Sequence, residues 1–313
     1  MRTIPPELVI PSVIALLVIV VLIAIVVFVV GSLAGWWAKQ FTVEKLIAFL
    51  EPHIRVYKPE GEGPFPAVLQ LHGCGGAKEI QDEYAVAARD AGVLVLILDS
   101  LTPRGIGFDE AVRRVCTGRV LRGRERAGDL VAGLEMLRRR PDVDPDQLAV
   151  VGWSHGGWTI MDLLALDIPH EKPFNLRDVP RDPWKGVKAI ELIYPFAGFP
   201  SLTRERGWKR TDIPCDVLVI KNDTVAPNRA TYASLEKARQ SGAELTVETW
   251  EGVTHAFEES VHTPGSKLRY NPERAAEAHA RYANWVKDVF GLGAAAPAPE
   301  VPASEAVSPA DGS

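Results

Sequence analysis

The segment Gly152-Trp153-Ser154-His155-Gly156-Gly157 places a serine between glycines, directly after the apolar run 148–151. This pattern predicts a buried strand that turns sharply into a helix, with the serine at the apex. Glycines two positions before and after the serine remove side chains that so tight a turn would bring into collision. The predicted chemistry is nucleophilic attack by Ser154, with the amide of His155 directed at an oxyanion. The same pattern also arises by chance in glycine-rich turns, so the neighbouring segments decide its meaning.

An aspartate and a histidine follow the serine along the chain, each after a predicted strand. Asp223 follows the run 217–221, and His255 follows a strand that ends at Trp250. Alone, Asp223 has an ordinary explanation as a helix cap, and His255 as an exposed loop residue. The order serine, aspartate, histidine and the strand context favour a triad instead. His255 would take the serine proton, and Asp223 would fix the imidazole tautomer.

A glycine-rich loop, His72-Gly73-Cys74-Gly75-Gly76, follows another apolar run and is placed to supply a second oxyanion amide. We expect that amide to be Cys74, paired with the amide of His155. The side chains of His72 and His155 are interpreted as packing or hydrogen-bonding groups. The loop lacks the Lys-Ser/Thr of a phosphate-binding loop, and the His, Cys and Asp spacing is not that of a metal site. The sequence therefore predicts neither a cofactor nor a metal.

The elements needed to position these groups alternate between strands and helices after Pro52. Alternation at this spacing predicts an α/β fold of the α/β-hydrolase type, a mostly parallel sheet covered by helices on both faces. The predicted strands are 54–57, 67–71, 93–98, 148–151, 187–194, 217–221 and 244–250, and the predicted helices are 78–91, 124–140, 155–166, 229–240 and 272–290.

Together these motifs make residues 52–290 resemble the dienelactone hydrolase family of α/β-hydrolases. The resemblance is carried by the segments 72–76, 99–105, 152–157 and 255–257 and by Asp223. It implies hydrolysis of an ester or lactone by a nucleophile-His-Asp triad without a cofactor. The best-known members have cysteine where Ser154 stands, so enol-lactone specificity does not carry over. No arginine stands just after His255, where Glu258 and Glu259 occur instead. The residues expected to contact the substrate are Arg104, which would bind a substrate carboxylate, and Trp153 and Phe257.

The N-terminal segment is apolar enough for a membrane. The run 13–30 covers roughly 27 Å as a helix, close to the hydrocarbon thickness of a bilayer. Trp36 and Trp37 resemble an interfacial belt. We expect residues 1–38 to be a retained anchor with a transmembrane helix at about 8–31; a cleaved signal peptide is the alternative, because Ser32-Leu33-Ala34 offers small residues. The expected domains are this anchor, a neck at 39–51, a catalytic domain at 52–292 and a disordered Ala/Pro-rich tail at 293–313.

The net charge of -5 and the scattered basic residues give no general attraction to nucleic acid, so no nucleic-acid partner is expected. Three cysteines do not make a disulfide scaffold, but Cys74 and Cys116 lie in loops after neighbouring strands of this fold. A bridge between them, with Cys215 free, would place the domain on the extracytoplasmic side; three reduced cysteines would fit a cytosolic domain. Oligomeric state is not predicted.

Three functions remain open at this point. The first is a membrane-anchored serine hydrolase acting on a small-molecule ester or lactone. The second is a serine peptidase acting on short peptides, because prolyl-peptidase-like enzymes share the same elbow and fold. The third is a catalytically idle binding module tethered to the membrane, against which the presence of Ser154, Asp223 and His255 argues.

Overall fold

The computed structural model describes residues 6–261 and 266–293 and contains a seven-stranded sheet. The strand order is β1-β3-β2-β4-β5-β6-β7, with β1 antiparallel to β3 and every other neighbouring pair parallel. The predicted α/β-hydrolase-type sheet is therefore confirmed. The strands are β1 Arg55–Tyr57, β2 Phe65–Leu71, β3 Leu94–Leu98, β4 Val143–Trp153, β5 Val187–Ile193, β6 Cys215–Ile220 and β7 Leu245–Trp250.

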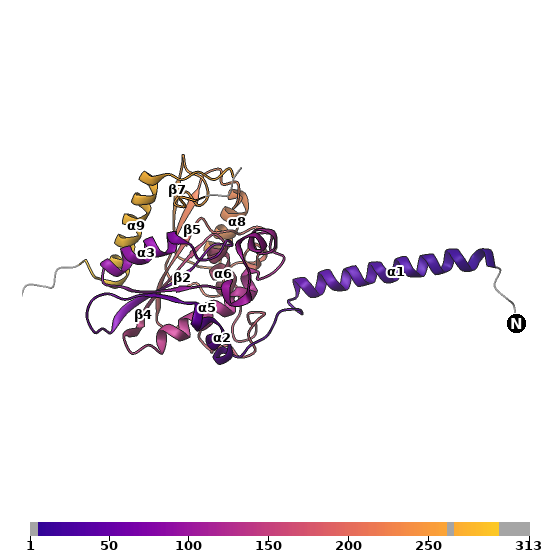
Figure 1. Cartoon of the computed structure of the whole chain (residues 1–313), viewed down its shortest axis with the longest axis horizontal. Helices are drawn as coiled ribbons and strands as arrows, with labels where there is room; N and C mark the ends of the chain where they lie inside the picture. Colours follow the sequence, from indigo (N-terminus) through magenta and orange to yellow (C-terminus); the bar gives the residue numbers. More distant parts are fainter. Residues whose placement is uncertain (1–5, 262–265, 294–313) are drawn as a thin grey trace, which may run out of the picture.

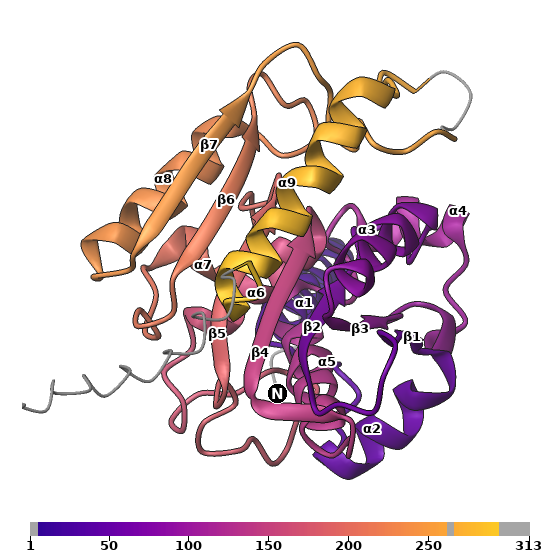
Figure 2. The same cartoon turned by 90° about the vertical axis from the view of Figure 1, so that its left-hand side faces the viewer.

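Helices cover both faces of this sheet, as Figure 2 shows from the side of α3 and α9. On the opposite face lie α2, α5, α6 and α8. The longer helices are α1 Pro6–Leu33, α2 Val43–Leu50, α3 Glu79–Asp90, α5 Gly123–Arg138, α6 His155–Leu164, α8 Asn228–Gln240 and α9 Pro272–Phe290, and the shorter segments are η1 Glu51–His53, η2 Thr102–Arg104, α4 Phe108–Glu110, η3 Ala111–Val115 and α7 Leu202–Glu205.

The central strands are buried on both faces, which explains their continuous apolar sequences. All five residues of β3 are buried. Val95 and Ile97 pack into the cluster beneath α3 and α9, whereas Leu94 and Leu96 join the larger cluster on the other face. This alternation follows from the two-residue period of a strand. Because these strands are parallel, their carboxyl ends lie at the same end of the sheet, and the loops after β2, β3, β4, β6 and β7 meet there.

The segment expected to be a neck is part of the packed domain. In α2, the side chains of Val43, Leu46, Ile47 and Leu50 are buried in the larger core cluster and pack against α5. Thr42 caps the helix by accepting a hydrogen bond from the Lys45 amide. The expected start of the catalytic domain at residue 52 is therefore too late, because α2 contributes to the same core as the sheet.

Helix α1 projects from the side of the domain formed by α2, α5 and α6 (Figure 1). Its segment Val13–Ser32 is long and apolar enough to cross a membrane, by length and composition, and it is not buried by the rest of the protein. A membrane span and a signal sequence both meet this criterion. The predicted disordered tail, apart from Gly293, lies outside the described residues.

Candidate active site

The turn between β4 and α6 has the strained geometry expected of a nucleophile elbow. Ser154 has φ 50° and ψ -106°, a conformation that few residues other than glycine adopt. A Cβ atom on Gly152 would lie 2.5 Å from the backbone carbon of Gly156, and one on Gly156 would overlap the carbonyl oxygen of Leu71. The two glycines are therefore needed for close approach of three backbone segments. The strain fixes the position of the serine hydroxyl.

Ser154, His255 and Asp223 are joined in one hydrogen-bonded chain. His255 Nε2 lies 2.9 Å from Ser154 Oγ, and His255 Nδ1 lies 2.6 Å from Asp223 Oδ2. All three residues are at most 9% exposed. In this arrangement His255 can accept the serine proton while its Nδ1–H donates to the carboxylate.

The carboxylate of Asp223 is itself held in place by its loop. Its Oδ1 accepts hydrogen bonds from the amides of Val225 and Ala226, at 2.7 and 2.9 Å. The Asp223 amide donates to Asn228 Oδ1, and the Asn228 side chain in turn donates to the carbonyl of Ile220 at the end of β6. Oδ2 is thus left to orient His255.

The glycine-rich loop after β2 approaches the serine, and a disulfide holds it there. A Cβ on Gly73 would lie 3.7 Å from Ser154 Cβ. Among the described residues, no acceptor is found for the backbone amides of Cys74 and His155, as expected of oxyanion donors. Of the two alternatives left open for the cysteines, the structure has the bridge: Cys74 and Cys116 form a disulfide with Cα atoms 5.0 Å apart, and Cys215 is free and buried.

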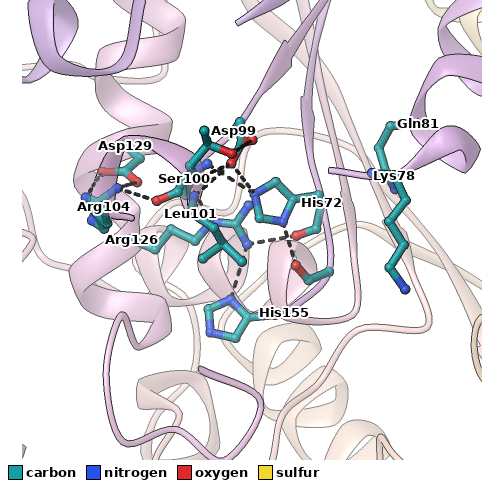
Figure 3. Close-up of polar contacts among 12 residues, drawn as sticks. His72, Lys78, Gln81, Asp99, Ser100, Leu101, Arg104, Arg126, Asp129 and His155 are labelled. Carbon is teal, nitrogen blue, oxygen red and sulfur yellow. Dashed lines mark hydrogen bonds and ion pairs between the residues drawn. The ribbon is translucent and has the colours of Figure 1, made fainter. Parts of the chain in front are cut away.

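A buried guanidinium that the sequence analysis missed connects the loops around the site (Figure 3). Arg126, on α5, donates through Nη1 to the His72 carbonyl at 2.8 Å and through Nε to Ser100 Oγ at 2.9 Å. Its Nη1 also lies 3.3 Å from His155 Nδ1. Arg126 thereby joins the oxyanion loop, the loop after β3 and the first residue of α6. The signal was a basic residue on an otherwise apolar face of the predicted helix 124–140.

Burial and positive charge keep the two histidines of this cluster neutral. Desolvation, and secondarily Arg126, lowers the pKa of His72 to about 3 and the pKa of His155 well below its usual value. Neutral His72 accepts from the Ser100 amide at Nε2 and faces the Gly73 carbonyl with Nδ1. Burial also lowers the pKa of Arg126 to about 10, so the guanidinium stays charged at neutral pH. Both histidine side chains are structural, as predicted.

A second buried carboxyl lies behind His255. The Tyr194 ring packs on the His255 ring with centroids 4.5 Å apart. The hydroxyls of Tyr194 and Tyr84 donate to the two carboxyl oxygens of Glu258, at 3.1 and 3.0 Å. Burial raises the pKa of Glu258 to about 7. Glu258 therefore fixes the aromatic side chain that supports His255 and does not face the substrate.

A cavity of about 460 Å³ opens above Ser154 and His255. Its walls are mainly apolar and include the disulfide; the apolar side chains are Ile80, Phe108, Val112, Trp153, Val225 and Leu268. Two charged groups, Lys78 and Glu259, also line it, and they form an ion pair with Nζ to Oε2 at 2.5 Å. Within residues 6–261 and 266–293 no group of three or more potential metal ligands is found.

Of the three residues expected to contact substrate, the structure places one in the cavity. Trp153 lines it. Arg104 does not, because its guanidinium is paired with buried Asp129, with Nη2 to Oδ1 at 2.8 Å, and Nη1 donates to the Ser100 carbonyl. Phe257 is fully buried and packs against Trp250. Both expectations failed because the sequence does not show which distant group a side chain meets.

Two family models match adjoining parts of the chain. Residues 83–174 match the prolyl oligopeptidase family, and residues 185–290 match the dienelactone hydrolase family. Among curated proteins, "Probable dipeptidyl-aminopeptidase B" of Grosmannia clavigera is 30% identical over 134 residues, which is 40% of this chain and 13% of that protein. The protein of the same name from Fusarium vanettenii is 30% identical over 131 residues, 40% of this chain and 14% of its own length. The matched segment thus spans about a seventh of these relatives.

Solved structures share the fold over most of this chain. Esterase 2 of Thermogutta terrifontis, phosphoramylated by tabun, is 14% identical with a TM-score of 0.54, covering 76% of this chain and 89% of its own. A dienelactone hydrolase-like promiscuous phosphotriesterase, P91, from metagenomic libraries is 18% identical with a TM-score of 0.54, covering 76% and 92%. At these identities the likeness shows the fold.

Proposed function

We propose that this chain, which has the α/β-hydrolase fold and matches the dienelactone hydrolase family over residues 185–290, cleaves a small carboxylic ester or lactone through an acyl-enzyme on Ser154. The observation that carries the proposal is the hydrogen-bonded chain from Ser154 through His255 to Asp223, at the base of a largely apolar cavity. The esterase among the structural neighbours fits this reaction.

The mechanism follows from the groups in place. His255 Nε2 takes the proton of Ser154 Oγ as the oxygen attacks the ester carbonyl carbon. The negative charge formed on the carbonyl oxygen is stabilised by the amides of Cys74 and His155. The imidazolium, held by Asp223, then protonates the departing alcohol oxygen, leaving an acyl group on Ser154. Water, deprotonated by His255, attacks this acyl group; the acid leaves and Ser154 recovers its proton.

The side chains that line the cavity favour an uncharged substrate. Lys78 is neutralised by Glu259, and Arg104 is engaged by Asp129, so neither cation is placed to hold a substrate carboxylate. The remaining walls offer apolar contact to an acyl or alkyl group. This favours a neutral ester or lactone over the anionic lactones implied by the best-known members of the family.

A peptidase acting on short peptides is the second candidate. It is supported by the prolyl oligopeptidase match over residues 83–174 and by the name of the curated relatives. Glu259 is a carboxylate that could bind a peptide's N-terminal ammonium if it separated from Lys78. The intact ion pair favours the ester.

We further propose that α1 is a retained membrane anchor and that the catalytic domain lies on the extracytoplasmic side. The length of the exposed apolar helix supports the anchor. The Cys74–Cys116 disulfide supports an oxidising compartment, because such bridges persist there and are rare in the cytosol.

Replacement of the nucleophile tests the proposed reaction. The purified full-length chain should hydrolyse p-nitrophenyl acetate and react covalently with a fluorophosphonate probe, whereas Ser154→Ala should lose the labelling and several orders of magnitude in kcat. The matched control is Ser234→Ala, which changes another buried serine, on α8, and should retain both activities. Ester hydrolysis by Ser154→Ala at the wild-type rate would exclude the assignment, and preference for aminoacyl p-nitroanilides would favour the peptidase. A wild-type chain that neither reacts with the fluorophosphonate probe nor hydrolyses any of these substrates would support the catalytically idle binding module.

A further inference from the structure

One short segment of the chain contacts both the candidate active site and the end of α1. Phe108, Val112 and Cys116 line the cavity above Ser154. A few residues later, Arg122 Nη1 donates a hydrogen bond to the carbonyl of Ser32, in the last turn of α1. The chain from Cys116 to Arg122 can span at most about 20 Å. Residues that line the cavity and the residue that contacts the last turn of α1 thus belong to one short segment, joined by that length of chain plus the Arg122 side chain. Figure 1 shows this segment on the side of the domain facing α1.

Exposed apolar side chains lie on this side of the domain. Phe108 is 44% exposed and Val112 is 45% exposed, although both also line the cavity. Trp36 and Trp37, just beyond α1, are each 62% exposed. Indole side chains immediately after an apolar span are typical of the membrane–water interface. Exposed apolar side chains thus occur both at the rim of the cavity and next to the end of α1. Exposed apolar surface of this kind marks a site of interaction with a membrane or a partner.

The same segment carries uncompensated positive charge. Arg113 and Arg119 are exposed, and neither lies within ion-pair distance of a carboxylate in the described part of the chain. Arg114 is paired with Glu110, and Asp109 is the exposed acidic residue nearby. Arg119 also lines a crevice with Trp37, next to the end of α1. Basic side chains beside interfacial indoles complement the phosphate groups of an anionic leaflet.

We propose that residues 108–122 rest on an anionic membrane surface and that the cavity opens there, so that the substrate is the ester of an amphiphile drawn from the bilayer. This inference rests on the proposed serine hydrolase and on the proposed anchor, and it names their substrate class. The ester bond of such a molecule lies near the interface, where Ser154 can reach it. The apolar walls of the cavity then bind the hydrocarbon chain of the substrate as it leaves the bilayer.

Two esters with the same leaving group test the proposal. Full-length protein is reconstituted in phosphatidylcholine vesicles with or without phosphatidylglycerol, and release of p-nitrophenol is followed. The substrates are water-soluble p-nitrophenyl acetate and bilayer-embedded p-nitrophenyl palmitate. The test variant is Arg113→Glu with Arg119→Glu, neither of which lines the cavity above Ser154. The control is Arg181→Glu with Lys188→Glu. Both cations are exposed; Arg181 lies in the loop before β5 and Lys188 is the second residue of that strand, at the end of the sheet away from the loops around Ser154.

We expect phosphatidylglycerol to speed palmitate hydrolysis by the wild type. The Arg113 and Arg119 reversals should lower that rate by at least about fivefold, the effect of losing one basic group near an anionic surface. Acetate hydrolysis and the control variant should be unaffected. An unchanged palmitate rate in the test variant, or equal losses for both esters, would overturn the inference. Acetate hydrolysis without palmitate hydrolysis would overturn it while leaving the proposed function intact, and failure with both esters would overturn the proposed function itself.

Discussion

Arg126 carries its positive charge in the interior of the domain, where burial of a charge is energetically unfavourable. Burial of a guanidinium costs several kcal/mol unless its donors are satisfied, and Nη2 of Arg126 is buried without a hydrogen-bond partner in the described part of the chain. Here it donates to the His72 carbonyl and Ser100 Oγ and lies against His155. His72 is the first residue of the loop that carries the proposed Cys74 oxyanion amide, and His155 carries the other proposed oxyanion amide. Arg126 therefore acts as a positioning residue for both donors.

Substitution of Arg126 should lower kcat more than it raises KM. In Arg126→Met, the loops carrying the two amides lose their common donor, and a misplacement of about 1 Å can cost roughly a hundredfold in rate. We expect kcat for p-nitrophenyl acetate to fall about tenfold to a hundredfold with KM little changed, because the cavity walls remain. The rate of fluorophosphonate labelling should fall in parallel. Arg126→Lys should restore part of the loss, since an ammonium can still donate to one acceptor.

The neighbouring arginine provides the control for this prediction. Arg104→Met removes the ion pair with buried Asp129 but no contact with His72 or His155. It should lower the melting temperature while leaving kcat near the wild-type value at temperatures where circular dichroism shows a folded protein. Equal losses of kcat in both variants would mean that Arg126 acts through general stability alone.

The residues recognised from sequence are those whose neighbours along the chain define them. Ser154 was found from its flanking glycines, and Asp223 and His255 from the strands that precede them. Arg104 and Phe257 were assigned to the substrate because nothing local distinguishes a cavity residue from a buried one. Their partners, Asp129 and Trp250, come from other segments, and the fold determines those contacts.

At the level of elements, the disulfide joins the oxyanion loop to the segment after β3. The linked cysteines are 42 positions apart, and a bridge closing such a loop typically contributes roughly 2–4 kcal/mol to the free energy of unfolding. The double variant Cys74→Ser with Cys116→Ser should therefore unfold at lower denaturant concentration. It should also lose kcat, by up to about a hundredfold, because one oxyanion donor is less well positioned.

Chemical denaturation and ester kinetics check this prediction together. Cys215→Ala is the control, since it removes a buried thiol at the start of β6 without touching either loop. Alkylation followed by intact mass should label one cysteine in unreduced, unfolded wild type and three after reduction. Three labelled cysteines before reduction would show that the bridge is absent in the protein as isolated.

Strands and helices were predicted well because their signals are local. The continuous apolar run of β3 and the glycine that follows α9 are examples. The role of α2 was not predicted correctly. Its amphipathic pattern suits a helix at a membrane surface as well as a helix that packs on a protein core. Contact with α5, far along the chain, decides between them.

For the whole molecule, the boundary between anchor and domain can be tested by truncation. A chain that starts at residue 39 lacks α1 but keeps α2, and it should be soluble without detergent and retain ester activity. A chain that starts at residue 52 also loses four buried side chains, each contributing roughly 1.5–3 kcal/mol. That loss approaches the whole stability of a typical domain, about 5–15 kcal/mol. We expect the shorter chain to aggregate or unfold, as thermal denaturation would show.

Equal stability of the two truncated chains would contradict the assignment of α2 to the core. If the chain that starts at residue 39 required detergent, apolar surface other than α1 would hold the protein at the membrane. Extraction of the full-length protein by high salt or carbonate would argue against a retained span.

If the proposed activity and location hold, the disulfide would also set the stage in the life of the protein at which hydrolysis reaches its full rate. A newly made chain in a reducing cytosol would carry two separate thiols at Cys74 and Cys116, and the loop after β2 would not yet be linked to residues 108–122. Oxidation after the proposed translocation would form the bridge and so fix the position of the loop that carries the Cys74 amide. Full activity would therefore develop only on the far side of the membrane, and esters in the leaflet where the chain is synthesised would be cleaved more slowly during its export.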